Sequence, residues 1–99
     1  MSKKYNVSYK SVFLYNNDGI SVIFPGLPGC LTYGTSDSKA KQMAIDALKV
    51  YCEELLRAGK ALPTKMSDLE ISKWIEEHKK EWGKTKYSIK TIISNVEEF

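Results

Sequence analysis

The chain opens with a run in which apolar and polar residues alternate. Its apolar side contains Tyr5, Val7, Tyr9, Phe13 and Tyr15, and the positions between them include Asn6, Ser8 and Lys10. A period of two residues predicts a half-buried strand over residues 5–15. The segment 16–19, Asn-Asn-Asp-Gly, tolerates positive φ and predicts a hairpin to a second strand at 20–24. The segment 30–33 predicts a third strand, so the first third of the chain reads as an antiparallel meander.

The longest periodic signal lies between residues 37 and 58. Apolar residues recur there every three or four positions, namely Ala40, Met43, Ala44, Ala47, Leu48, Tyr51, Cys52, Leu55 and Leu56. This spacing predicts a helix with one broad apolar face, which we expect to cover one side of the sheet. Ser36 is a suitable N-cap and Asp37 suits the positive end of the helix dipole. Gly59 stands where a left-handed residue commonly ends a helix.

A Leu-Pro-Thr break at 62–64 separates this helix from the last third of the chain. Ser67 and Glu70 have the spacing of a capping box, which predicts a second, shorter helix. One face of this helix would carry Ile71, Trp74, Ile75, His78 and Trp82, and Gly83 would end it. The segment 87–96 is rich in β-branched residues and predicts a final strand.

These elements predict an α+β fold in the order β-β-β-α-(α)-β. One long helix would pack on an antiparallel sheet, and a short accessory helix would precede the last strand. We expect residues 1–99 to form a single domain. Residues 24–34 contain two prolines and three glycines, which fix the direction of the backbone at one corner. This corner has the character of a fold signature that carries no chemistry of its own.

The composition is that of an ordinary folded domain, with 42% hydrophobic residues, 27% charged residues and a net charge of +3. Two cysteines and one histidine are too few for a structural zinc site, which needs four ligands. The N-terminus lacks the apolar stretch of a signal peptide, and no segment approaches the ~20 apolar residues that span a bilayer. We therefore expect a cytoplasmic protein without metal, cofactor or membrane association.

The corner and its flanks carry a resemblance to a known family. They read Gly19-x-x-Val22-x-Phe24-Pro25-x-Leu27-Pro28-Gly29-Cys30-x-Thr32-x-Gly34, followed by a helix with Ala40 and Ala44 and then by Leu62-Pro63. In this order and spacing, residues 5–65 resemble the HicB family of bacterial antitoxins. Residues 1–65 would form the core of the family match, and residues 66–99 would add the accessory helix and the final strand.

The resemblance implies a fold related to a degraded ribonuclease H fold. It also implies a partner, the HicA toxin, a small mRNA-cleaving ribonuclease that the antitoxin binds and blocks, and a homo-oligomer of the antitoxin. The signature residues would set the corner that orients strand and helix; they are Gly19, Phe24, Pro25, Leu27, Pro28, Gly29, Cys30 and Gly34. Two departures stand out. Ser38 and Lys39 replace the acidic pair that usually opens the helix, and residues 66–99 do not read as a DNA-binding helix-turn-helix or ribbon-helix-helix.

Catalysis is not expected. Ribonuclease H chemistry needs carboxylates that converge on divalent metals, one of them on a central strand, and the first strand has none. The acids instead lie in a turn or along helices, where surface exposure is their usual state. His78 lies beside two tryptophans and has the character of a packing residue.

The alternative function is an RNA-binding protein of the same fold. Aromatic residues on the first strand, with lysines nearby, resemble sheets that stack bases, although the same residues would serve as core under the long helix. The candidates for nucleic-acid contact are Lys3, Lys4, Lys10, Lys79, Lys80, Lys84 and Lys86. Trp74 and Trp82 are candidates for partner binding, because they would either cover the core or form an apolar patch.

Overall fold

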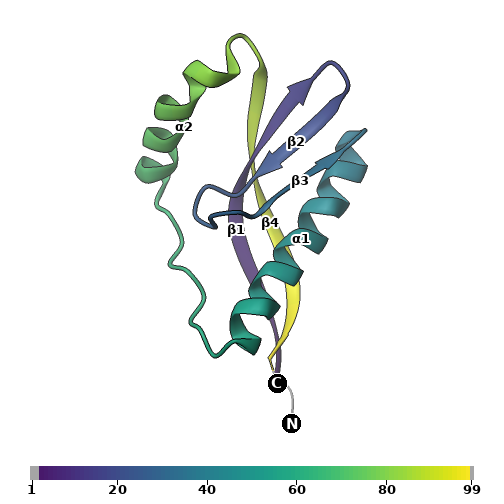
Figure 1. The fold of residues 1–99 in the computed structure, drawn as a ribbon, viewed down its shortest axis with the longest axis vertical. Coiled ribbons are helices and arrows are strands. Elements are labelled where there is room, and N and C mark those ends of the chain that lie inside the picture. The colour runs from purple at the N-terminus through teal and green to yellow at the C-terminus, as the bar shows by residue number, and fades with distance from the viewer. Residues whose placement is uncertain (1–2, 99) are drawn as a thin grey trace.

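The computed structural model describes residues 3–98 and confirms the predicted order of elements (Figure 1). The strands and helices are β1 (Lys3–Asn16), β2 (Gly19–Ile23), β3 (Leu31–Gly34), α1 (Asp37–Arg57), α2 (Asp68–Trp82) and β4 (Lys86–Glu98). Each lies within a few residues of its predicted position. The fold is α+β, with one antiparallel sheet and two helices.

The four strands are arranged in the order β3-β2-β1-β4. β1 pairs with β4 along almost its whole length, from Lys3 opposite Glu98 to Tyr15 opposite Lys86. Only the last part of β1, from Val12 opposite Ile23 onward, also pairs with β2. The first part of β1 and the last part of β4 therefore form a two-stranded ribbon that extends beyond the four-stranded region, toward the end where both termini lie (Figure 1).

The main core lies between α1 and one face of the sheet. The alternation predicted for the first strand is confirmed, since Val7, Tyr9 and Phe13 are buried on this face. The helix contributes four fully buried residues, namely Ala40, Ala44, Leu48 and Cys52. Two of them are alanines, so the helix approaches the sheet closely.

Gly34 permits this close approach at the end of β3. A Cβ atom on Gly34 would collide with the backbone of Ala40 in the first turn of α1. The signature glycine at this position therefore has a steric reason.

A second, smaller core lies on the opposite face of the sheet. Val12 and Leu14 of β1 are buried there against Ile71 and Ile75 of α2. The side of the first strand that is polar up to Lys10 therefore carries buried apolar residues after it. At this end the sheet is covered on both faces. The accessory helix forms the third layer of the domain.

The helix termini follow the sequence signals. Ser36 caps α1 by accepting a hydrogen bond from the Lys39 amide, and Gly59 has a φ of +74° just after the helix. Ser67 and Glu70 form the predicted capping box at the start of α2. These local signals are confirmed because each depends on residues only a few positions apart.

Candidate protein-binding groove

The signature corner consists of two consecutive β-turns. The Leu27 amide donates to the Phe24 carbonyl at 3.0 Å, and the Cys30 amide donates to the Leu27 carbonyl at 2.9 Å. Pro25 and Pro28 each occupy the second position of their turn, which their fixed φ suits. Gly29 follows Pro28 with a φ of +82°, as the third position of a type II turn requires.

The two turns bury the apolar members of the signature. Phe24 and Leu27 are each 1% exposed and belong to the main core. Cys30 is also buried, and its thiol points toward the carbonyl of Ala47 in α1, with 3.9 Å between sulfur and oxygen. The Tyr51 hydroxyl donates to the Pro28 carbonyl at 3.0 Å. The corner is thereby tied to the middle of α1.

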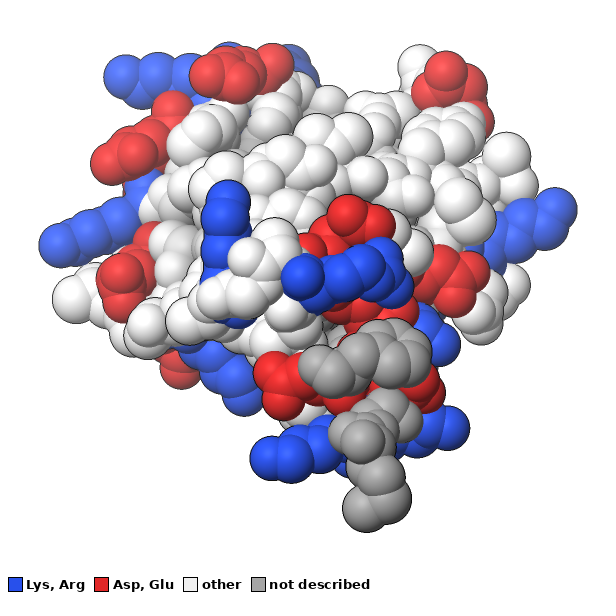
Figure 2. Space-filling view, turned by 60° about the horizontal axis from the view of Figure 1, so that its bottom comes forward, with Lys and Arg blue, Asp and Glu red and all other residues white. Residues whose placement is uncertain are grey.

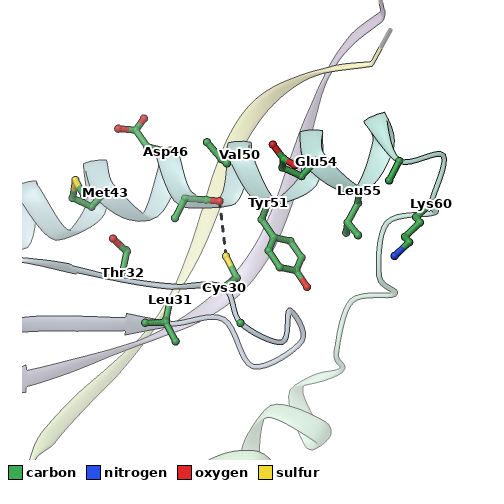
Figure 3. A pocket seen from close by; sticks show the side chains of 13 residues that line it. Cys30, Leu31, Thr32, Met43, Asp46, Val50, Tyr51, Glu54, Leu55 and Lys60 are labelled. Carbon is green, nitrogen blue, oxygen red and sulfur yellow. Dashed lines mark hydrogen bonds between the residues drawn. The ribbon is translucent and has the colours of Figure 1, made fainter.

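A groove of about 600 Å³ lies between this corner, β3 and α1 (Figure 3). Cys30 lies at its base, and Tyr51 and Leu55 point into it from the helix. Its surroundings are mostly apolar. The acidic residues Asp46 and Glu54 lie along the same stretch of α1, and Lys60 lies at the far end.

Three apolar side chains around the groove are exposed to solvent. Leu31 is 67% exposed, Val50 is 58% exposed and Met43 is 45% exposed. Met43 was expected in the apolar face of the long helix, and its exposure corrects that expectation. It lies beside Leu31 and Thr32 of β3, the strand at one edge of the sheet. A cluster of exposed apolar side chains beside a groove is typical of a protein-binding surface.

β3 adds an unpaired main-chain edge to this surface. It is an outer strand of the sheet, and its hydrogen-bonding partner β2 lies on one side only. The peptide groups that face away from β2 are therefore available to a partner. The groove thus combines apolar side chains, carboxylates and an open strand edge.

The buried thiol at the base of the groove is not suited to nucleophilic chemistry. Burial raises the pKa of the Cys30 thiol to about 11, so it is protonated at neutral pH. Within residues 3–98, no three His, Cys, Asp or Glu side chains group together as metal ligands would.

The two tryptophans predicted as partner contacts lie on the other face of the sheet. Trp74 and Trp82 are half-buried and pack against the small core under α2. The Trp74 ring stacks on the His78 ring at a centroid distance of 4.1 Å, and the His78 Nδ1 atom lies 2.8 Å from the Trp74 carbonyl. This arrangement favours a packing role for all three side chains.

The structure does not bring the candidate lysines together. Lys3 and Lys86 lie at opposite ends of the paired strands β1 and β4, about 40 Å apart at about 3.3 Å per residue. Several of the others have acidic neighbours, such as Lys4 at 3.6 Å from Glu97 and Lys10 in an ion pair with Asp68. Figure 2 shows positive and negative side chains interspersed around an uncharged area. A nucleic-acid interface instead needs lysines gathered on one surface.

Two aromatic residues of the first strand are not available for stacking on bases. Tyr9 is 7% exposed and Phe13 is 0% exposed, and both lie under α1. The Tyr9 hydroxyl is used internally, because it donates to the Pro63 carbonyl at 2.7 Å. These rings serve the core.

Most of the chain matches the model of one protein family. Residues 10–96 match the model of the HicB-like antitoxin of bacterial toxin-antitoxin systems. The chain belongs to the HicB-like antitoxin family. The match includes α2 and most of β4, so the accessory helix and nearly all of the last strand fall within the HicB-like region. A search of curated proteins finds no match.

Solved structures with the same fold come from toxin-antitoxin systems. A chain of a toxin-antitoxin complex from Streptococcus pneumoniae has a TM-score of 0.76 and 17% identity, covering 91% of this chain and 69% of that one. A chain of the HicA3 and HicB3 toxin-antitoxin complex has a TM-score of 0.61 and 24% identity, covering 91% of this chain and 95% of that one. The N-terminal domain of the Burkholderia pseudomallei antitoxin HicB has a TM-score of 0.58 and 17% identity, with coverage of 85% and 95%.

Sequence reasoning did not single out the groove, although it identified the corner beside it. Val50 is an apolar residue on the polar side of α1, and Leu31 begins a strand of four residues, so both positions carried a weak signal. That the two side chains border one groove depends on the placement of β3 beside α1.

Among the described residues, no helix is both long and apolar enough to cross a membrane.

Proposed function

We propose that this HicB-like chain binds a small HicA-type ribonuclease toxin and occludes it, without catalysis of its own. Family membership is the observation that carries the proposal, since the family is one of antitoxins from toxin-antitoxin systems. The solved HicA3 and HicB3 complex shares the fold of this chain and supports the same kind of partner. The encounter would take place in the cytoplasm, where mRNA is the target of such a toxin.

The groove between β3 and α1 is the surface that we assign to the toxin. A ribonuclease that holds RNA presents a cationic surface to the phosphate backbone. Asp46 and Glu54 lie beside the groove and would complement such a surface, while Leu31 and Val50 would supply the apolar contacts. Charge complementarity of this kind speeds association and selects the partner, and buried apolar anchors slow dissociation.

The test is co-expression with a HicA-type ribonuclease. The chain should relieve the growth arrest that the ribonuclease causes and should co-purify with it. Leu31→Asp and Val50→Asp should each weaken the purified complex roughly tenfold or more, because each places a charge in the apolar contact.

Leu69→Asp is the matched control, because Leu69 is 65% exposed, as Leu31 is, but lies on α2. It should leave binding unchanged. If the wild-type chain neither binds the ribonuclease nor relieves the arrest, the antitoxin function is wrong. If the wild-type chain binds and all three variants bind equally well, the function stands and the groove is the wrong surface.

A further inference from the structure

The direction of the peptide groups along the open edge of β3 follows from one hydrogen bond. The Phe24 amide donates to the Cys30 carbonyl at 3.1 Å, so the carbonyl of Cys30 faces the strand that carries Phe24. In an antiparallel ladder this direction alternates from one residue to the next. The N–H and C=O groups of Leu31 and Tyr33 therefore face outward, away from β2.

The helix α1 runs back along the same strand. The Cys30 Sγ atom lies 3.9 Å from the Ala47 carbonyl oxygen, and a Cβ atom on Gly34 would meet the backbone of Ala40. The start of α1 is thus level with the end of β3, and the middle of α1 is level with the corner. Seven helix residues rise about 10 Å and four strand residues about 13 Å, so helix and strand stay side by side over this length.

The side of α1 beside this edge carries charges of opposite sign at its two ends. Lys39 borders a hollow of about 300 Å³ at the end of β3. Met43 borders both this hollow and the larger groove. Asp46 and Glu54 follow further along α1, beside the groove (Figure 3). The edge of β3 therefore has a cation near its end and carboxylates near its beginning.

Two of these charges have no partner of opposite charge. Within residues 3–98, neither Lys39 nor Asp46 takes part in an ion pair, and both are exposed. Asp46 accepts a hydrogen bond only from the neutral Gln42 amide, at 3.2 Å. Glu54 instead pairs with Arg57 at 3.3 Å. Lys39 and Asp46 are therefore the two charges that a partner can satisfy.

We propose that a HicA-type toxin adds an extended segment of its own to β3 as a fifth, antiparallel strand. This inference rests on the proposed function and names the part of the toxin that the groove takes. The outward N–H and C=O groups of Leu31 and Tyr33 would bond to the main chain of the segment. The antiparallel direction continues the pattern of the sheet and is slightly more stable per residue than the parallel one.

The charges beside the edge define the two ends of this segment. The residue opposite Gly34 faces α1 near Lys39 and is acidic. The residue opposite Cys30 faces α1 near Asp46 and is basic. Opposite charges at both ends set the register, because a shift along the edge or a reversed direction would separate each pair or bring like charges together.

The middle of the segment is apolar. The residue opposite Thr32 lies on the α1 side, where Met43 is exposed. Its two neighbours lie on the other face of the sheet, beside the exposed side chains of Leu31 and Tyr33. Cross-strand contacts of this kind stabilise added strands. Read from its N-terminus, the segment is therefore one acidic residue, three apolar residues and one basic residue.

The first test is amide hydrogen exchange of the labelled chain, alone and in complex with a HicA-type ribonuclease. The amides of Leu31 and Tyr33 should exchange at least roughly tenfold more slowly in the complex, because they become hydrogen-bonded. The amides of Thr32 and Gly34 face β2 and should be protected in both states. This alternation distinguishes an added strand from contact through side chains alone.

The second test removes one outward-facing amide. Leu31→Pro and Leu31→Ala both shorten the side chain, but only proline also removes the N–H group, and it leaves the bonds to β2 in place. The proline variant should bind the ribonuclease roughly tenfold more weakly than the alanine variant. Circular dichroism checks that both variants are folded.

The third test addresses the charges. Asp46→Lys should weaken the complex roughly tenfold or more, because it repels the basic end of the segment. Glu77→Lys is the matched control, since Glu77 is also exposed but lies on α2, and it should leave binding unchanged. Lys39→Glu should weaken the complex as well, because it repels the acidic end.

The outcomes separate this inference from the proposed function. If the wild-type chain forms no complex with the ribonuclease, the proposed function fails and the added strand fails with it. If the complex forms, but the Leu31 and Tyr33 amides stay unprotected and the two Leu31 variants bind equally well, the function stands and the added strand is wrong. If the amides are protected but Asp46→Lys and Lys39→Glu bind as the wild-type chain does, the charge pattern of the segment is overturned.

Discussion

The two helices cover the same sheet in different ways. α1 buries four residues completely, two of them alanines, and lies close to the sheet along its length. α2 buries only Ile71 and Ile75, and half-buried aromatic rings fill the space around them. Small side chains bring a helix close and give a dense core, whereas large ones hold it further away. The comparison indicates that the α1 side determines global stability and that α2 is a separable layer.

The largest expected effect is at the centre of the α1 side. Phe13→Ala should lower the free energy of unfolding by about 3–5 kcal/mol, because it leaves a cavity in the main core and removes the ring beneath the Lys90 ammonium group. Denaturant unfolding measures this loss. Phe13→Leu fills most of the space and should cost much less. Equal losses for both variants would show that the site is not tightly packed.

The corresponding change on the α2 side should be smaller and local. Ile75→Ala should cost about 2–3 kcal/mol, the lower part of the usual range, since the half-exposed rings around it have room to close in. Hydrogen exchange should then show lost protection in α2 and retained protection in α1. A uniform loss across both helices would contradict the idea of a separable layer.

The close approach of α1 has its own test. Gly34→Ala should cost about 1–3 kcal/mol, because its new Cβ atom meets the backbone of Ala40. Gly26→Ala is the matched control in the same signature, since its Cβ atom would find nothing nearer than Met66 at 3.4 Å. Thermal unfolding of the two variants should differ clearly. If the two substitutions cost the same, close packing of α1 against β3 is not the reason for the glycine.

The two N-caps allow a smaller comparison. Ser67→Ala should cost about 1 kcal/mol, because it removes the hydroxyl oxygen that accepts from the Glu70 amide and leaves only the bond from the Ser67 amide to the Glu70 carboxylate in the capping box on α2. Ser36→Ala removes a single capping bond on α1, whose packing holds the helix in place, and should cost less. Circular dichroism with denaturant checks both variants. A larger loss for Ser36→Ala would reverse the expected dependence of the helices on their caps.

The capping box also has a pH dependence. Its hydrogen bonds lower the pKa of the Glu70 carboxyl, so its contribution is present above the ordinary glutamate pKa and is lost as the pH falls through the lowered value. Glu70→Gln should reduce the acid sensitivity of α2.

The smallest effect concerns the thiol beneath the groove. Because burial raises the pKa of Cys30 to about 11, its contribution to stability is complete below the ordinary thiol pKa and declines as the pH rises toward 11. The difference between the urea midpoints at neutral and at alkaline pH should therefore be slightly smaller in Cys30→Ala than in the wild-type chain. Burial also raises the pKa of Cys52, so part of the dependence should remain. An unchanged alkaline loss in Cys30→Ala would assign the whole effect to other groups.

Local signals account for most of what was predicted correctly. The strand alternation, the helix period, the capping box and the two prolines of the corner each depend on residues close together in the chain, and each is confirmed. The resemblance to the HicB family rested on the same stretch and is confirmed by the family match. The homo-oligomer, the nucleic-acid contacts and the partner-binding role of the tryptophans stay predictions.

The sequence by itself determined the elements of this protein, its corner and its family, because short-range backbone preferences and side-chain periods specify them. Only the tertiary structure decided that Val12 and Leu14 face α2, that Met43 is exposed, and that the lysines lie apart. Those outcomes depend on the pairing of β1 with β4, strands from opposite ends of the chain, and on the placement of α1 beside β3. Such long-range packing sets which side chains meet and which remain in water, and the groove follows from it.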